Sequence, residues 1–447
     1  MSFHINNQTI SDIELFSQDE KSNSLFSFYN RTKTSGGEEQ LYKIIKTPIS
    51  DLKFLENRKA EIQYILGLKC TLKLNKRQFD FVDYYLSNKH IPLKNNLIDA
   101  ARDLLANKLK SSNDYYVIRE GAYNLCCVLK DLSEFLENIR DTNPPQFLKE
   151  AIKTVEIYLE NKEIVHLIKK LPAESRKLKQ RQINRLDNLF RATKNKELRF
   201  VLNTIYEIDV LQSHCELLKG ENFCLPEYSP EAHTFEAVDC IHPFLSLAIP
   251  NSFKLDYKKS TIFLTGPNMS GKSTFLKTVG ILTYFAHLGI PVPAKKLSIP
   301  VLNGLFTTIN TSDSLSEGFS HFYAEVNRIK ELSVEIQSNR NLVVILDELF
   351  RGTNVKDAYE GTLMVVNLLS KIQGAFFFIS THILEVAEDL SNSDKIDFKC
   401  FESILNTDKP IYDYKLKKGV STERVGMQII KSERIEEILT EIIRKQN

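Results

Sequence analysis

The sequence has little cysteine, and none of it is spaced as a C-x-x-C pair. Its seven cysteines are an odd number, which argues against both a disulfide framework and a zinc site. No apolar run approaches the length that spans a bilayer, and the first ten residues lack the basic and apolar segments of a signal peptide. These absences predict a cytoplasmic protein in a reducing compartment, with no membrane partner.

Glycine is scarce in the first part of the chain. Five of the sixteen glycines lie in residues 1–260, and the other eleven lie in residues 261–447. Scarce glycine favours helices in the first part, whereas the second part has the glycines that tight strand–loop–helix turns need. A chain of 447 residues is too long for one core. We expect domains at 1–235 and 236–447, divided where prolines interrupt the helical pattern.

Apolar residues recur at helical spacing in three stretches of the first domain. They cover residues 118–139, 148–170 and 198–218. The first stretch ends before Asn143-Pro144-Pro145, a sequence that breaks helices. The pattern therefore predicts an all-helical first domain.

The second domain contains the pattern G-x-x-x-x-G-K-[ST], which cradles nucleotide phosphates. Its residues are Gly266, Pro267, Asn268, Met269, Ser270, Gly271, Lys272, Ser273 and Thr274. The glycines let the backbone N–H groups face the phosphates, Lys272 supplies positive charge, and the Ser273 hydroxyl can ligate Mg²⁺. An apolar run before the loop predicts a buried strand, and a helical pattern follows it. We predict a nucleotide site; the alternative is a glycine turn that binds nothing.

Two further apolar runs end in polar residues that suit ATP hydrolysis. Residues 341–346 precede Asp347 and Glu348, and residues 375–379 precede a Ser-Thr-His triplet ending at His382. Asp347 can hold Mg²⁺ through a water, Glu348 can orient or deprotonate the attacking water, and His382 can sense the γ-phosphate. The alternatives are an exposed loop carboxylate at Glu348 and a structural histidine at His382.

A glycine-bearing polar loop, residues 313–322, lies between the phosphate loop and the apolar run at residues 341–346. Such a loop ahead of a helix is a second potential anion site, although many helix N-termini look similar. Together the motifs GPNMSGKSTFLK, DSLSEGFSHF, LDELFRGTNVKDAYEG and STH resemble the ATPase domain of the MutS DNA mismatch repair family. The resemblance extends from about residue 20 to about residue 435.

The resemblance implies an α plus α/β fold, with a helical core and lever domain followed by an ABC-type P-loop ATPase domain. It implies ATP and Mg²⁺ as ligands and a homodimer in which Gly318 and Ser320 of one subunit complete the site of the other. It places Tyr414 on the adenine and Ile249 and Asn251 near the base. Tyr414 could equally be a surface tyrosine.

The sequence also departs from the family. The loop reads Gly-Phe-Ser-His where Gly-Arg-Ser-Thr is usual, and Phe350 stands where glycine is usual. We expect no mismatch-reading or connector domain ahead of the core, a reduced or absent clamp, and no appended nuclease or tetramerisation domain. We then expect no domain in this sequence that recognises a mismatched base pair.

A basic stretch lies where the family inserts its clamp. Residues 169–199 hold eleven basic and three acidic side chains. Such a surface can neutralise several DNA phosphates; the alternative is a solvated helix face. The candidate DNA contacts are Arg176, Lys177, Lys179, Arg181 and Arg185.

The sequence thus predicts a dimeric Mg²⁺-dependent ATPase that acts on duplex DNA in mismatch repair or recombination, with possible repair proteins as partners. The alternative hypothesis is a nucleotide-gated scaffold that binds partner proteins and does not bind DNA. A small-molecule kinase fits less well, because no arginine-rich lid follows the phosphate loop.

Overall fold

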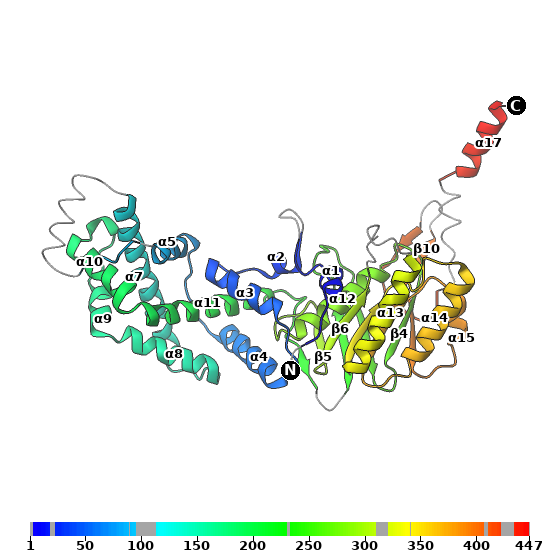
Figure 1. The fold of residues 1–447 in the computed structure, drawn as a ribbon, viewed down its shortest axis with the longest axis horizontal. Coiled ribbons are helices and arrows are strands. Elements are labelled where there is room, and N and C mark those ends of the chain that lie inside the picture. The colour runs from blue at the N-terminus through cyan, green and yellow to red at the C-terminus, as the bar shows by residue number, and fades with distance from the viewer. Residues whose placement is uncertain are drawn as a thin grey trace. The chain divides into compact units, whose positions relative to one another are not determined.

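The chain forms two compact units. The computed structural model describes residues 3–17, 23–88, 90–94, 113–229, 233–309, 321–339, 341–405, 410–421 and 433–446. The α/β unit comprises Met1–Phe28, Thr47–Glu56 and Leu218–Asn447, and the helical unit comprises Tyr29–Lys46 and Asn57–Leu217 (Figure 1). In this division the last segment of the α/β unit begins at Leu218, and two earlier segments pack with it; the boundary between residues 235 and 236 stays a prediction.

The described part of the helical unit is built from helices. Its elements are α3 (Ser35–Lys46), α5 (Lys76–Ser87), α7 (Asn113–Ile139), α8 (Gln146–Leu159), α9 (Lys162–Lys169), η1 (Ser175–Lys177), α10 (Gln180–Asn188) and the π-helical turn η2 (Leu189–Thr193). Three helices continue across its borders: α2 (Leu25–Tyr29), α4 (Leu52–Gly67) and α11 (Asn195–Leu218).

The three predicted helices are present, with one difference. Helices α7 and α11 confirm the first and third stretches. The middle stretch forms two helices, α8 and α9, that meet at Glu160 and Asn161. The Asn161 side chain accepts a hydrogen bond from the Glu163 N–H at 3.0 Å. An asparagine that caps a new helix in this way competes with continuation of the preceding one.

The α/β unit is built on a six-stranded sheet in the order β12-β9-β4-β8-β7-β6. Its strands are β4 (Thr261–Thr265), β6 (Gly304–Thr308), β7 (Leu342–Leu346), β8 (Phe376–Ser380), β9 (Ile396–Cys400) and β12 (Lys417–Lys418). All neighbours pair in parallel except β12, which runs antiparallel to β9. The predicted strands before the glycine loop, before Asp347 and before the Ser-Thr-His triplet are therefore confirmed, and their carboxyl ends meet at one edge.

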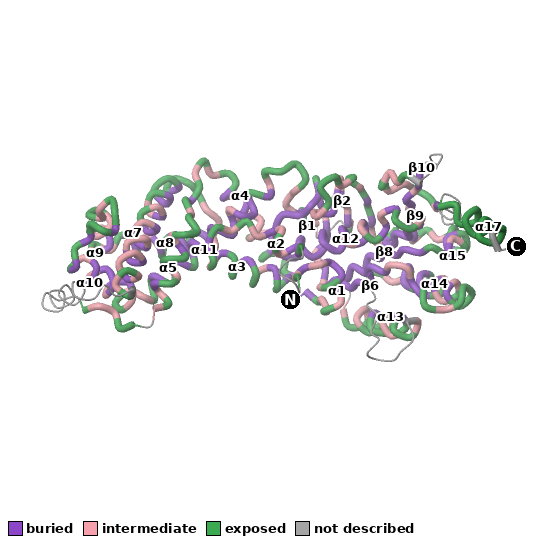
Figure 2. The backbone as a smooth tube through the Cα atoms, turned by 90° about the horizontal axis from the view of Figure 1, so that it is seen from above, coloured by how far each residue is buried: buried purple, intermediate pink, exposed green. Residues whose placement is uncertain are grey.

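Both faces of this sheet are covered. Helices α13 (His321–Ser338), α14 (Val355–Leu369) and α15 (Leu384–Asp389) contribute to a core with Phe263, Val344 and Phe377 on one face. Helix α12 (Lys272–Ala286) contacts β6 and β7, and the Phe235 ring meets Phe376 and Phe378 of β8. Figure 2 shows the resulting burial along β8 and α12. Strands that are buried on both faces of a parallel sheet need apolar side chains at nearly every position, which explains the continuous apolar runs in the sequence.

Smaller strands complete the unit. A four-stranded sheet has the order β1-β5-β2-β3, and β10 pairs with β11. Their bounds are β1 (Glu227–Tyr228), β2 (Thr234–Cys240), β3 (Asn251–Asp256), β5 (Lys296–Ile299), β10 (Ser403–Leu405) and β11 (Pro410–Tyr412). The last helix is α17 (Ile435–Gln446). Among the described residues, none of the helices is at once long and hydrophobic enough to cross a bilayer.

The N-terminal segment packs on the main sheet. Helix α1 (Asn7–Asp12) brings the fully buried Asp12 to the end of β6. Its carboxylate accepts hydrogen bonds from the Thr307 hydroxyl at 2.6 Å and from the Ile309 N–H at 3.0 Å. Nearby, Glu14 forms a 2.6 Å ion pair with Lys277 of α12. These contacts are why the first residues belong to the α/β unit.

Candidate functional site

The loop between β4 and α12 has the backbone of an anion cradle. Gly266, Met269 and Gly271 have φ values of 146°, 67° and 103°. A Cβ atom on Gly266 would lie 2.7 Å from the carbonyl oxygen of Phe401, so this position requires glycine. Gly271 caps α12 without a side-chain hydrogen bond, which leaves the helix N-terminus facing the loop.

Two side chains of the loop are buried polar groups. The Lys272 ammonium donates to the carbonyl oxygens of Gly266 at 2.8 Å and Pro267 at 3.1 Å. Burial lowers the pKa of Lys272, while the nearby charges of Glu348 and Asp347 act in the opposite direction. The buried Ser270 hydroxyl has no hydrogen-bond partner among the described residues. A loop with unused donors and a buried cation fits the phosphates of a nucleotide.

The acidic pair lies where β7 ends. Burial raises the pKa of Asp347, although hydrogen bonds to the Ser273 and Ser380 side chains favour its ionised form. Glu348 has a φ of 52°, and its N–H lies 3.0 Å from the Ser380 hydroxyl and 3.2 Å from the Ser380 carbonyl oxygen. The Ser380 hydroxyl in turn donates to Asp347. Ser380 therefore fixes both carboxyl-bearing residues at the sheet edge.

Ser273 and Asp347 fit a magnesium ion. They provide two hard oxygen donors in mutual contact, the donor type that Mg²⁺ prefers when phosphates and waters supply its other ligands. In the described part of the chain, no group of three or more His, Cys, Asp or Glu side chains forms a metal site.

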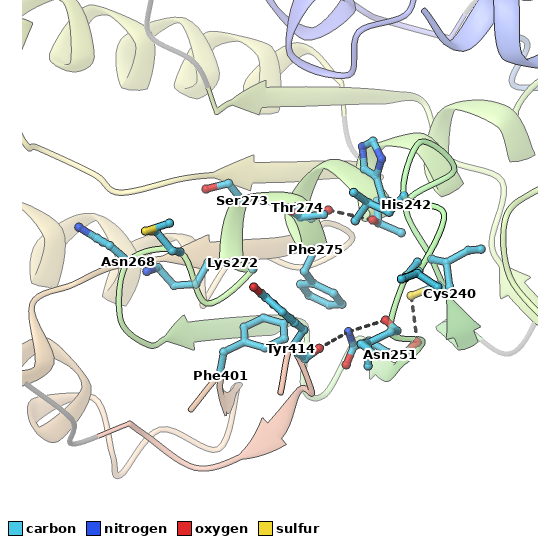
Figure 3. Close-up of a pocket in the computed structure, with 18 of the residues that line it drawn as sticks. Cys240, His242, Asn251, Asn268, Lys272, Ser273, Thr274, Phe275, Phe401 and Tyr414 are labelled. Carbon is cyan, nitrogen blue, oxygen red and sulfur yellow. Dashed lines mark hydrogen bonds between the residues drawn. The ribbon is translucent and has the colours of Figure 1, made fainter. Parts of the chain in front are cut away.

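A pocket of about 800 Å³ joins the loop to distant segments, a size typical of small-ligand sites. The predicted residues among its lining are Asn268, Met269, Gly271, Lys272, Ser273, Thr274, Glu348, Ile249, Asn251 and Tyr414. Figure 3 shows Lys272 within the curve of the loop and Tyr414 beside the loop, with Asn251 bonded to the Tyr414 segment. Residues from four separated stretches thus meet at one cavity.

Asn251 holds the Tyr414 segment beside the loop. Its side-chain Nδ2 donates to the Tyr414 carbonyl oxygen at 3.0 Å, and its side-chain Oδ1 accepts a hydrogen bond from the Leu416 N–H at 2.7 Å. Tyr414 has a φ of 53° and an exposed fraction of 45%. Its ring lies 3.3 Å from where a Cβ atom on Gly271 would stand. An aromatic face of this kind can stack on a nucleobase.

Other predicted residues lie apart from the pocket lining. Gly266, Pro267, Ser270 and Asp347 do not line it. His382 follows β8 but is exposed and does not line the pocket. Gly318 and Ser320 lie outside the described residues.

The basic stretch in the helical unit is less uniform than its sequence indicates. Arg176, Lys177, Lys179 and Arg181 are exposed. Arg176 and Lys177 pair with Glu174 at 4.0 and 3.8 Å, and the half-buried Arg185 pairs with Glu163 at 2.8 Å. Arg191, one of the eleven basic residues counted above, is not a surface group. Its side chain is 4% exposed and forms a 2.5 Å ion pair with the fully buried Asp187.

Sequence reasoning missed several residues that shape the site. Ser380 was part of the Ser-Thr-His motif, but only the histidine was considered. Arg351 lines the pocket and pairs with Glu348 at 3.2 Å, a contact that its i+3 spacing could have indicated. Much of the segment between β2 and β3 also lines the pocket, beyond the predicted Ile249: Ile241, His242 and residues 245–248. Nothing in its composition signals a ligand.

Family models and curated proteins match much of this sequence. Family models match residues 262–446 as MutS domain V and residues 8–214 as MutS domain III. The DNA mismatch repair protein MutS of Petrotoga mobilis is 29% identical over 252 residues, covering 54% of this chain and 31% of that protein. MutS of Staphylococcus aureus strain JH9 is 30% identical over 237 residues (51% and 26%), and MutS of Bacillus licheniformis is 27% identical over 232 residues (50% and 26%).

The chain spans between about a quarter and a third of the length of these relatives. The two matched domains nevertheless follow in one order along it and together account for most of its residues. The chain belongs to the MutS family.

Proposed function

We propose that this chain is a Mg²⁺-dependent ATPase with a P-loop fold, which works as a homodimer and acts on DNA in mismatch repair or recombination. The pocket carries the proposal, because it unites the glycine loop, Glu348 and Tyr414 in one cavity. The α/β unit would bind and hydrolyse ATP, and the helical unit would respond as core and lever. The seven cysteines of the sequence suit a reducing compartment, and we propose a cytoplasmic location.

The residues of the loop would bind the phosphates. Lys272 would exchange its two loop carbonyl oxygens for β- and γ-phosphate oxygens, and the N–H groups at the start of α12 would contact the same anion. Ser273 and Asp347 would hold Mg²⁺, which neutralises charge on the phosphates. Tyr414 would stack on adenine, with Ile249 and Asn251 beside the base.

Glu348 would direct hydrolysis. It would orient the attacking water and accept its proton as the water oxygen bonds to the γ-phosphorus and the bond to the ADP oxygen breaks. His382 would contact the γ-phosphate or the water from the end of β8. Gly318 and Ser320 of a second subunit would complete the site, so that ATP at the interface closes the dimer and hydrolysis opens it.

The catalytic assignment is tested with two variants. Lys272→Ala should abolish ATP binding, and Glu348→Ala should bind ATP but accumulate as an ATP-bound dimer. Binding is measured with a fluorescent ATP analogue, and dimers are measured by light scattering. Unchanged turnover in Glu348→Ala would contradict the mechanism.

The shared site has its own test. Mixing a Ser320→Ala subunit with a Lys272→Ala subunit should restore one composite site, and activity should depend on protein concentration. Specific activity that stays constant on dilution well below micromolar concentration, with no recovery on mixing, would exclude trans completion.

DNA action is tested by comparing ATPase rates with and without homoduplex, mismatched and branched DNA. Neutralising Arg176, Lys177, Lys179 and Arg181 together should weaken binding. It should also reduce the slope of log affinity against log salt by up to about 0.9 for each lost phosphate contact.

A matched control removes as much charge elsewhere on the helical unit. It neutralises four other exposed basic residues: Arg140, Lys149, Lys153 and Lys162. Equal loss in both variants would mean nonspecific attraction. No salt-dependent DNA binding by the unmodified protein would favour the scaffold function, in which ATP gates the binding of partner proteins.

A further inference from the structure

Glu325 is a buried carboxylate that the proposed mechanism does not use. It lies in the first turns of α13 and is 7% exposed. Its Oε2 atom has no hydrogen-bond partner among the described residues. Burying a carboxylate is costly unless nearby groups favour its charge. The position of those groups therefore indicates what Glu325 does.

Glu325 faces the turn that follows the acidic pair. Burial raises its pKa, but the Arg351 charge and the backbone N–H groups of Arg351, Gly352 and Phe350 favour the ionised carboxylate. One turn earlier on the helix, the Phe322 ring contacts the Phe350 ring with centroids 5.7 Å apart. The start of α13 thus packs on this turn through the Phe322–Phe350 contact, and the charge and N–H groups of the same turn favour the ionised Glu325.

This turn needs support because its backbone is strained. Glu348 and Phe350 have φ values of 52° and 62°, in the left-handed region that is strained for residues other than glycine. The next residue, Arg351, pairs with Glu348 at 3.2 Å, and both side chains line the pocket. The conformation of residues 348–352 therefore sets where the Glu348 carboxylate points.

We propose that Glu325 is a positioning residue for Glu348, which acts by holding the Phe350–Gly352 backbone and Arg351. This inference rests on the proposed ATPase function. Glu325 does not line the pocket, so its removal should alter the hydrolytic step and leave nucleotide binding intact. A residue that only stabilised the fold would affect both together.

The experiment compares Glu325→Ala and Glu325→Gln in the full chain. Glutamine keeps an oxygen that accepts N–H bonds, so Glu325→Gln should retain more turnover than Glu325→Ala. We expect kcat to fall about 10- to 100-fold in Glu325→Ala, the scale of a small misplacement of a catalytic group. The dissociation constant for an ATP analogue in EDTA should change less than about twofold. Glu331→Gln, an exposed change on the same helix, should behave as the unmodified protein.

Hydrogen exchange of peptides covering residues 348–353 provides a reading that needs no hydrolysis. Exchange should be faster in Glu325→Ala than in the unmodified protein, with Glu325→Gln between them. Unchanged kcat in Glu325→Ala would overturn the inference, as would equal losses of kcat and nucleotide affinity. If the unmodified protein hydrolyses no ATP, the proposed ATPase function fails. Hydrogen exchange then still tests the contact between Glu325 and residues 350–352. Unchanged exchange in Glu325→Ala would refute that contact, and faster exchange would support it.

Discussion

The Ser380 hydroxyl lies 3.0 Å from the Glu348 N–H and also donates a hydrogen bond to Asp347. One buried hydroxyl at the end of β8 thus connects the two acidic residues at the end of β7. The parallel pairing of β7 with β8 brings them together. The orientation of both carboxylates therefore depends on the neighbouring strand as well as on their own.

Ser380→Ala should reduce ATP hydrolysis more than ATP binding. Loss of a hydrogen bond to a charged group costs about 1.5–3 kcal/mol, so kcat should fall about 10- to 100-fold if that cost is expressed in the transition state. Steady-state kinetics and binding in EDTA separate the two effects. Ser333→Ala on the exposed face of α13 is the control. Equal kcat in both variants would show that the hydroxyl does not orient the acidic pair.

Tyr414→Phe should keep nucleotide affinity, whereas Tyr414→Ala should weaken it. Stacking of a base on an aromatic ring is worth about 1–3 kcal/mol, which corresponds to about a 5- to 100-fold change in the dissociation constant. Asn251→Ala should weaken binding as well, because it releases the Tyr414 segment. Titration with ATP and with inorganic triphosphate distinguishes base contacts from phosphate contacts. Equal losses for the two ligands would exclude a stacking role.

Phe350 and Gly361 should be coupled in stability. A Cβ atom on Gly361 would lie 3.1 Å from two atoms of the Phe350 ring. Gly361→Ala should therefore lower the free energy of unfolding by up to about 2 kcal/mol, despite alanine's higher helix propensity. In a Phe350→Ala background the same change should raise it by about 1 kcal/mol. Urea unfolding of the four proteins measures this cycle, and additive effects would contradict the contact.

Stability should fall at acidic pH because His287 is buried in its neutral form. Its Nε2 accepts the Leu302 N–H at 2.8 Å, and its Nδ1 donates to the Thr283 carbonyl oxygen at 2.7 Å. Burial lowers the pKa of His287 from 6.5 to about 4. The unfolded chain therefore binds the proton first as the pH falls. The stabilisation is complete above about pH 6.5 and is lost towards pH 4, by about 1.4 kcal/mol per pH unit.

Urea unfolding between pH 7 and pH 4.5 measures this loss. His287→Gln removes the titrating group, so its free energy of unfolding should change less with pH than that of the unmodified protein. The difference between the two proteins is informative because other buried groups titrate in both. Parallel pH profiles would show that His287 does not titrate on unfolding.

The centre of the α/β unit was predictable from sequence because its strands are short, apolar and followed at once by polar residues. The glycine loop, Asp347 and Glu348 then come together because parallel strands end at one edge. Pattern alone could not place Asn251 beside Tyr414, since 163 residues separate them. Nor could it show that Arg191 is buried in a stretch of surface charges, because only its contact with Asp187 reveals this. Asn161 ended a helix whose apolar spacing continued unchanged.

The docking of the N-terminal segment has a consequence for synthesis. Asp12 meets Thr307 across 295 residues, and ribosomes add about 5–20 residues per second. The segment must therefore wait roughly 15–60 seconds for its binding surface to emerge. During that time the residues of the helical unit are translated, and the apolar side chains of Phe3, Ile13 and Leu15, all buried in the folded chain, lack their partners. Residues 3–15 thus reach their native place later than many residues that are translated after them.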